Sequence, residues 1–99
     1  MKKKIPLQND ENIISSITGL FEYFTGEQNV YFGDLLLTNK RLYLVGKNPI
    51  NIEESLWFNG EERENRQSTL IVGDHYIRIR WNCNGNLLEF IKMYQHLNL

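Results

Sequence analysis

The sequence contains little of what marks a secreted, membrane-spanning or polyanion-binding protein. One cysteine, Cys83, stands among 99 residues, so the chain cannot form an intramolecular disulfide or a multi-cysteine zinc site. The longest aliphatic runs have three residues, as in Leu35–Leu37, whereas a transmembrane helix needs about 20 apolar residues. The 11 Lys and Arg residues nearly balance the 12 Asp and Glu residues, so no overall field attracts a polyanion. These features favour a cytoplasmic chain.

Residues that carry chemistry are also scarce. His75, His96 and Cys83 are far apart in the sequence, and none has a neighbouring partner with the spacing of a metal site or a catalytic dyad. The seven glycines are dispersed and do not form a phosphate-binding loop. The sequence therefore predicts a protein that is not an enzyme and has no metal or cofactor.

Alternating apolar and polar residues dominate what is present, and this period of two predicts β-strands separated by short turns. The expected strands span residues 12–24, 30–38, 42–46, 50–58, 69–72 and 76–81. A break near Gly19 indicates a bulge or a bend in the first strand. In the last strand Ile77, Ile79 and Trp81 share one face, and Arg78 and Arg80 lie on the other. Residues 61–67 are expected to form a solvated loop or a polar edge strand.

The chain ends in a predicted amphipathic helix. Asn86 is its candidate N-cap, and the following apolar residues, Leu88 among them, lie on one broad face. The expected fold class is α+β but mainly β: a curved antiparallel sheet that forms a barrel of six to seven strands, capped by one C-terminal helix. Residues 1–10 are expected to be a flexible tail, and 11–99 a single domain.

Two stretches resemble bacterial pleckstrin-homology-like (PH-like) and GRAM-type domains. They are Asp10-Glu11-Asn12-Ile13-Ile14 and the run from Gly33 to Leu44, which contains Leu37-Thr38-Asn39-Lys40-Arg41-Leu42. The resemblance implies a PH-like fold and a module that presents loops and a groove to lipids, peptides or proteins. Family members that bind phosphoinositides use basic residues near the first hairpin. Residues 5–39 contain five carboxylates and no Lys or Arg, so we expect this hairpin to repel anionic headgroups.

Six residues are candidates for contact with a partner: Lys40, Arg41, Trp57, Phe58, Arg78 and Arg80. Lys40 and Arg41 occupy a predicted turn, where solvation of the turn is the alternative to contact. Arg78 and Arg80 share a face and either pair with the acidic residues Glu61, Glu62 and Glu64 or bind a partner's carboxylates. Because Trp57 and Phe58 are successive strand residues, they point to opposite faces, and one of them is expected outside the core.

The leading interpretation is a cytoplasmic, non-catalytic binding module that recognises a protein or peptide and regulates or inhibits it by occlusion. A homodimer through unpaired strand edges is a related possibility. An unrecognised enzyme is one rival class, and two alternative binding functions remain open. One is peripheral binding to anionic lipid, aided by Lys2, Lys3 and Lys4. The other is single-stranded nucleic-acid binding by Arg78, Arg80, Trp81, Tyr76, Lys40 and Arg41, which the overall acidity disfavours.

Overall fold

The computed structural model describes residues 7–24, 28–48, 50–60, 62–65 and 69–97, and for 62–65 the backbone alone. Its elements are β1 (Ile13–Phe24), β2 (Gln28–Thr38), β3 (Arg41–Asn48), β4 (Ile52–Trp57), β5 (Glu62–Asn65), β6 (Thr69–Val72), β7 (His75–Asn84) and α1 (Leu87–His96). The predicted strands are all present. Strand β5 lies in the charged stretch for which a loop was the alternative, so residues 62–65 form an edge strand, and the rest of that stretch lies outside the described residues.

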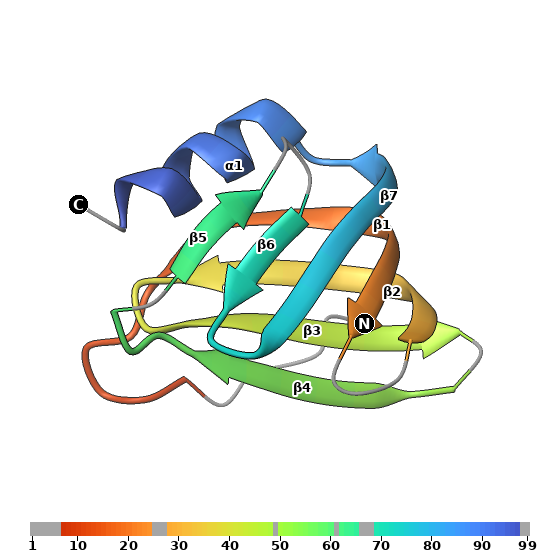
Figure 1. The fold of residues 1–99 in the computed structure, drawn as a ribbon, viewed down its shortest axis with the longest axis horizontal. Coiled ribbons are helices and arrows are strands. Elements are labelled where there is room, and N and C mark those ends of the chain that lie inside the picture. Colours follow the sequence, from red (N-terminus) through yellow and green to blue (C-terminus); the bar gives the residue numbers. More distant parts are fainter. Residues whose placement is uncertain (1–6, 25–27, 49, 61, 66–68, 98–99) are drawn as a thin grey trace.

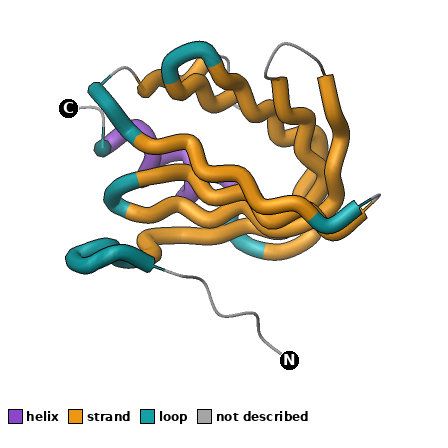
Figure 2. Tube along the Cα trace, turned by 90° about the horizontal axis from the view of Figure 1, so that it is seen from below, coloured by secondary structure: helices purple, strands orange, loops and turns teal. Residues whose placement is uncertain are grey.

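All seven strands form one antiparallel sheet in the order β4-β3-β2-β1-β7-β6-β5. The sheet is strongly curled, and α1 packs against β1 and β5 at one end (Figures 1 and 2). The expectation of a mainly β fold with a curved antiparallel sheet and one C-terminal helix is confirmed. Within the described residues the sheet does not close, because its outermost strands β4 and β5 do not pair with each other.

The core lies on the concave face of this sheet. In β1 to β4, β6 and β7, alternate residues point inward, since successive side chains of a strand face opposite sides. Phe90 and Tyr94 of α1 are buried among these inward-pointing side chains. The Tyr94 hydroxyl donates a hydrogen bond to the Ile71 carbonyl oxygen at 2.7 Å. The buried core comprises Ile17, Phe21, Tyr23, Leu35, Leu37, Leu42, Leu44, Leu56, Leu70, Val72, Ile77, Ile79, Phe90 and Tyr94.

The helix begins where the sequence predicts. The Asn86 side chain accepts a hydrogen bond from the Glu89 backbone N–H at 3.0 Å, which satisfies one of the otherwise unpaired N–H groups of the first turn. The inclusion of Leu88 in the apolar face is wrong, because this side chain is 79% exposed. The side of the helix that packs against the sheet is made up of residues 87, 90, 91 and 94. Leu88 lies on the opposite side of the helix.

Candidate partner-binding surface

A bulge in β7 decides which way Trp81 points. Phe21 pairs with Ile79, and the preceding residue Leu20 pairs with Trp81, so Arg80 is an extra residue in β7. The prediction that Trp81 shares a face with Ile77 and Ile79 is therefore wrong, and the indole is 56% exposed on the convex face of the sheet. The bulge depends on Gly19, because a Cβ at this position would lie 2.0 Å from the Trp81 carbonyl oxygen.

Trp81 is part of an aromatic and cationic surface that spans the convex side of β2, β1 and β7. The Phe32 ring lies 6.3 Å from the Trp81 ring, and the Phe24 ring lies 6.2 Å from the Tyr76 ring. Tyr76 is also exposed. We call this surface the Trp81 face and define it by Leu20, Glu22, Phe24, Phe32, Tyr76, Arg78, Arg80 and Trp81.

A buried carboxylate positions the two arginines of the Trp81 face. Arg80 Nη1 donates to Glu22 Oε2 at 2.8 Å, and Arg78 Nη1 lies 3.6 Å from Glu22 Oε1. Gln28 Nε2 also donates to Glu22 Oε2, at 2.6 Å. The side chains of Arg78 and Arg80 nevertheless remain 55% and 53% exposed. The predicted sharing of one face is correct, and among the described side chains the internal partner is Glu22. Glu61 and the side chains of Glu62 and Glu64 lie outside that set.

Arg41, by contrast, is not the solvated turn residue that was one of the two alternatives. Its guanidinium is buried, where Nε donates to Glu11 Oε2 at 2.8 Å and Nη1 donates to Ser55 Oγ at 2.8 Å. It also lies 4.6 Å from the centre of the Tyr43 ring and 4.4 Å from that of Trp57. We call Glu11, Thr38, Arg41 and Ser55 the Arg41 clasp. Arg41 serves the fold, because two aromatic rings and a carboxylate enclose its charge.

The Arg41 clasp also fastens residues that the sequence placed in a flexible tail. Thr38 Oγ1 donates to Glu11 Oε2 at 2.7 Å. The Asn39 side chain donates to the Asp10 carbonyl oxygen at 2.8 Å, and Lys40 Nζ donates to the Asn9 carbonyl oxygen at 3.0 Å. Residues 9–11 are thus hydrogen-bonded to the turn between β2 and β3, so Asn9 and Asp10, which were expected in the tail, are attached to the sheet. Residues 1–6, with Lys2, Lys3 and Lys4, lie outside the described part of the chain.

Trp57 and Phe58 point to opposite sides, as predicted. Trp57 is 43% exposed and stacks on Arg41, whereas Phe58 packs against the core with its ring 6.0 Å from that of Tyr94. Trp57 lies four strands from Arg78 in the sheet order, which corresponds to roughly 19 Å along the sheet at ~4.8 Å per strand. The six candidates therefore do not form one site: Arg78 and Arg80 are on the Trp81 face, and Lys40, Arg41 and Trp57 are at the Arg41 clasp.

Two ionisable groups near the Arg41 clasp have shifted pKa values. Burial acts to raise the pKa of Glu11. Hydrogen bonds from the Gln8 backbone, Arg41 and Thr38, together with the charge of Arg41, outweigh burial and bring this pKa below its ordinary value. Burial and the carboxylate of Glu53, which accepts from the Tyr43 hydroxyl at 2.6 Å, raise the pKa of Tyr43 to about 12. Glu11 therefore stays ionised and Tyr43 stays neutral at pH 7.

We expected the first hairpin to repel anions because residues 5–39 contain five carboxylates and no cation. The structure shows that cations from outside this segment lie beside some of these carboxylates. Cations from later strands neutralise three of the five carboxylates: Arg41 pairs with Glu11, Arg78 and Arg80 with Glu22, and Lys47 with Asp34 at 3.3 Å. Because these cations lie outside residues 5–39, a count restricted to that segment missed them. Repulsion by five uncompensated carboxylates is therefore not an argument against an anionic ligand.

The part of the chain that the structure describes contains neither a metal-binding cluster nor a membrane-spanning helix. No three His, Cys, Asp or Glu side chains there are close enough together to hold a metal ion. The same residues contain no helix that is both long and apolar enough to cross a bilayer. No family model, curated protein or solved structure matches the chain significantly.

Proposed function

We propose that this chain is a cytoplasmic, non-catalytic module of PH-like or GRAM-like type that binds a protein or peptide partner through the Trp81 face and regulates it by occlusion. The observation that carries the proposal is the gathering of exposed Trp81, Tyr76, Arg78 and Arg80 on the outer face of one strand, β7. Trp, Tyr and Arg are the residue types that dominate binding energy at protein interfaces. Strand β7 is paired with β1 on one side and with β6 on the other, so the sheet holds these side chains in fixed relative positions, which lowers the entropy lost on binding.

The charge of the Trp81 face indicates which partner it suits. Two guanidinium groups share one carboxylate, Glu22, so these three groups carry a net charge of +1 (2 − 1). Since half of each arginine side chain is exposed, N–H donors remain available for a bidentate bond to a carboxylate. The face therefore suits a peptide segment with an Asp or Glu between apolar residues that pack on Trp81 and Tyr76.

Single-stranded nucleic acid is a weaker candidate for the same surface. Exposed aromatic rings next to arginines also suit base stacking and phosphate contact. The platform considered from the sequence included Lys40 and Arg41, but Arg41 is buried at the Arg41 clasp. Two half-neutralised arginines remain, and a chain of net charge −1 supplies no wider attraction. These counts favour a protein partner.

Quantitative co-purification from the cells that produce this protein tests the proposal. Trp81→Ser and Arg80→Ser remove the two kinds of contact, and Leu88→Ser is the control because it removes an apolar side chain from α1 that is even more exposed than Trp81, at 79% against 56%. We expect one stoichiometric protein with the wild type and the control, and at least a tenfold loss with either face variant, as for a hot-spot residue. Circular dichroism checks that the variants are folded.

Two results would contradict the proposal. One is recovery of the same protein in the same amount with all three variants, which would place the interface elsewhere. The other is the absence of any stoichiometric protein, with tight binding instead to anionic vesicles or to a single-stranded oligonucleotide that decreases steeply with salt.

A further inference from the structure

The side chains of the Trp81 face lie in three rows across β2, β1 and β7. In order along β1, the rows are Phe32, Leu20 and Trp81; Val30, Glu22 and Arg78; and Gln28, Phe24 and Tyr76. The two outer rows carry the aromatic pairs, with ring centres 6.3 Å and 6.2 Å apart. Arg80, the extra residue of the bulge, also belongs to the middle row because it donates to Glu22. The face is therefore aromatic at both ends and charged in the middle.

The spacing of the rows follows from the strand register. Successive rows are two residues apart on β1, at Leu20, Glu22 and Phe24, and β2 follows β1 there without a register shift. At ~3.4 Å per residue, neighbouring rows are about 6.8 Å apart and the outer rows about 14 Å apart. A ligand that contacts all three rows must therefore place its side chains at the same intervals.

An extended segment that lies along β1 and β7 matches these intervals. Its alternate side chains point to one side, so residues i, i+2 and i+4 meet the three rows with the same rise per residue as β1. A helix fits less well. Its residues i, i+4 and i+8 advance by about 6 Å per step but turn by about 40° each time, so the third side chain points roughly 80° away from the first.

The middle row selects the charge of the residue that meets it. The Glu22 side chain is only 4% exposed, so it lies beneath Arg78 and Arg80 and leaves the outer edges of both guanidinium groups open to a ligand. A carboxylate accepts N–H bonds from guanidinium groups in this position, whereas a Lys or Arg side chain would be repelled.

From the spacing and the charge we infer that the Trp81 face binds an extended segment of a partner protein with the pattern apolar-x-acidic-x-apolar, where x is any residue. The acidic side chain bonds to Arg78 and Arg80, and the two apolar side chains pack on the aromatic pairs of the outer rows. The inference rests on the proposed function of this face and deepens it, because it fixes the conformation and the spacing of the bound segment.

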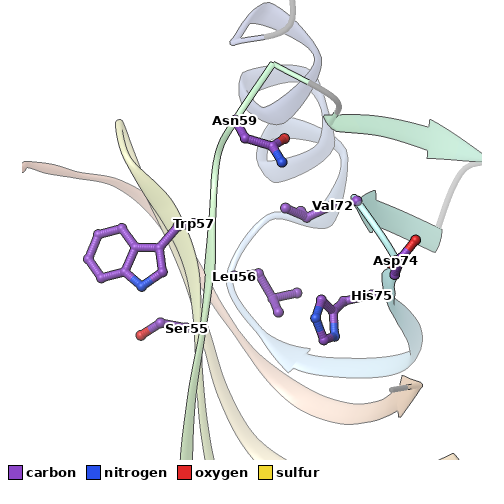
Figure 3. Close-up of a pocket in the computed structure, with 8 residues that line it drawn as sticks. Ser55, Leu56, Trp57, Asn59, Val72, Asp74 and His75 are labelled. Atoms are coloured by element: carbon purple, nitrogen blue, oxygen red, sulfur yellow. The ribbon is translucent and has the colours of Figure 1, made fainter. Parts of the chain in front are cut away.

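A hollow beside β4 is a competing site for a peptide. It has a volume of about 360 Å³ and lies between β4 and the turn between β6 and β7, where Leu56 points across the opening toward Val72 and His75 (Figure 3). The described residues that line it include the carboxylate of Asp74 but no Lys or Arg. An acidic segment is therefore expected on the Trp81 face, which β3, β2 and β1 separate from this hollow.

Peptides of equal composition test the spacing. The probe is blocked Phe-Ser-Glu-Ser-Phe, and its control is Ser-Phe-Glu-Phe-Ser, which in an extended chain turns both Phe side chains away from the side of Glu. Binding is followed by amide chemical shifts of the whole chain. We expect shifts centred on β1 and β7 and at least tenfold tighter binding of the probe. Equal binding of both peptides, no binding of the probe, or shifts centred on the hollow would overturn the inference.

Two further peptides test the charge and the conformation. Phe-Ser-Gln-Ser-Phe should bind at least tenfold more weakly than the probe, and added salt should reduce this difference. A peptide with three serines between Glu and each Phe has the helical spacing, and it should bind no better than the control. Tighter binding of this longer peptide than of the probe, or no loss with Gln, would overturn the inference.

Variants of the two outer rows test the placement of the segment. Trp81→Ser and Tyr76→Ser each remove one ring, and Leu88→Ser is the control. With one Phe of the probe replaced by Ala, we expect binding to become insensitive to one of the two ring variants and to stay sensitive to the other, whereas equal sensitivity to both would refute the placement. A co-purified partner that requires Trp81, together with a probe no tighter than its control, would refute the spacing and leave the proposed function intact. A probe that binds as expected, while the co-purified partner ignores Trp81→Ser, would support the spacing and refute the proposed function.

Discussion

Removal of the Glu11 carboxylate tests whether the Arg41 clasp holds the fold together. In Glu11→Ala the Arg41 guanidinium stays buried between Tyr43 and Trp57, but it loses its counter-charge and two hydrogen bonds. Breaking a buried pair by removing one partner destabilises by about 3–5 kcal/mol. The clasp lies at a turn rather than at the centre of the sheet, so we expect about 3 kcal/mol, a large part of the roughly 5–15 kcal/mol typical of a folded domain.

Urea unfolding followed by circular dichroism measures this loss. The double variant Glu11→Leu/Arg41→Met should recover much of it, because no unpaired charge is then buried. Asp34→Asn is the matched control: it weakens the exposed pair with Lys47, and exposed pairs contribute less than about 1 kcal/mol. A loss in Glu11→Ala no larger than that in Asp34→Asn, or a double variant as unstable as the single one, would refute the reasoning.

The pH dependence of the same contribution has a definite sign. The folded-state pKa of Glu11 lies below its ordinary value of 4.5, so the unfolded chain takes up a proton first as the pH falls. The stability that Glu11 contributes is therefore fully present above about pH 4.5 and is lost as the pH falls through its folded-state pKa. The difference in unfolding free energy between the wild type and Glu11→Gln should shrink over that acid range, and a difference that stays constant would contradict the assignment.

Three further predictions follow from single contacts. In an alkaline titration of phenolate absorbance, one tyrosine should titrate with a pKa of about 12, and this step should be missing in Tyr43→Phe. Because the folded-state pKa of Tyr43 is raised, the stability that its neutral form contributes is lost as the pH rises from 10 toward 12. Gly19→Ala forces a methyl group against the Trp81 carbonyl oxygen, and should destabilise by at least about 1–3 kcal/mol and shift the Trp81 fluorescence. Asn86→Ala removes the helix N-cap and should lower the unfolding free energy by about 1 kcal/mol, whereas Asn86→Asp should not.

Local patterns were sufficient to predict most of the fold. A period of two in the apolar residues placed the strands, and an Asn followed by apolar residues at helical spacing placed α1. These patterns work because the side-chain direction of a strand or helix residue follows from its position along that element. They failed at Trp81, where one extra residue in β7 reverses the side-chain direction beyond Arg80. The only local signal for this bulge is Gly19, which lies on the neighbouring strand.

The ion pairs could not be predicted in the same way. Glu22 and Arg80 are 58 residues apart, and Glu11 and Arg41 are 30 residues apart. The register of β1 with β7 brings Glu22 to Arg78 and Arg80, and the segment that precedes β1 brings Glu11 to Arg41 at the start of β3. Both arrangements are properties of the assembled sheet rather than of either segment. Cross-strand reasoning from the sequence offered instead Glu61, Glu62 and Glu64 as partners of Arg78 and Arg80, and turn chemistry offered solvent for Arg41.

The two stretches that resemble PH-like and GRAM-type domains contact each other, and this limits what the resemblance says about function. Glu11 binds Thr38 and Arg41, Asn39 binds the backbone of Asp10 and Asn12, and Lys40 reaches back to the first stretch. These side chains close the turn between β2 and β3 over the start of the sheet, so they are occupied by the fold itself. A protein that shares both stretches would be expected to share the Arg41 clasp, whatever it binds. The ligand must then be read from residues outside the two stretches, such as Tyr76, Arg78 and Trp81.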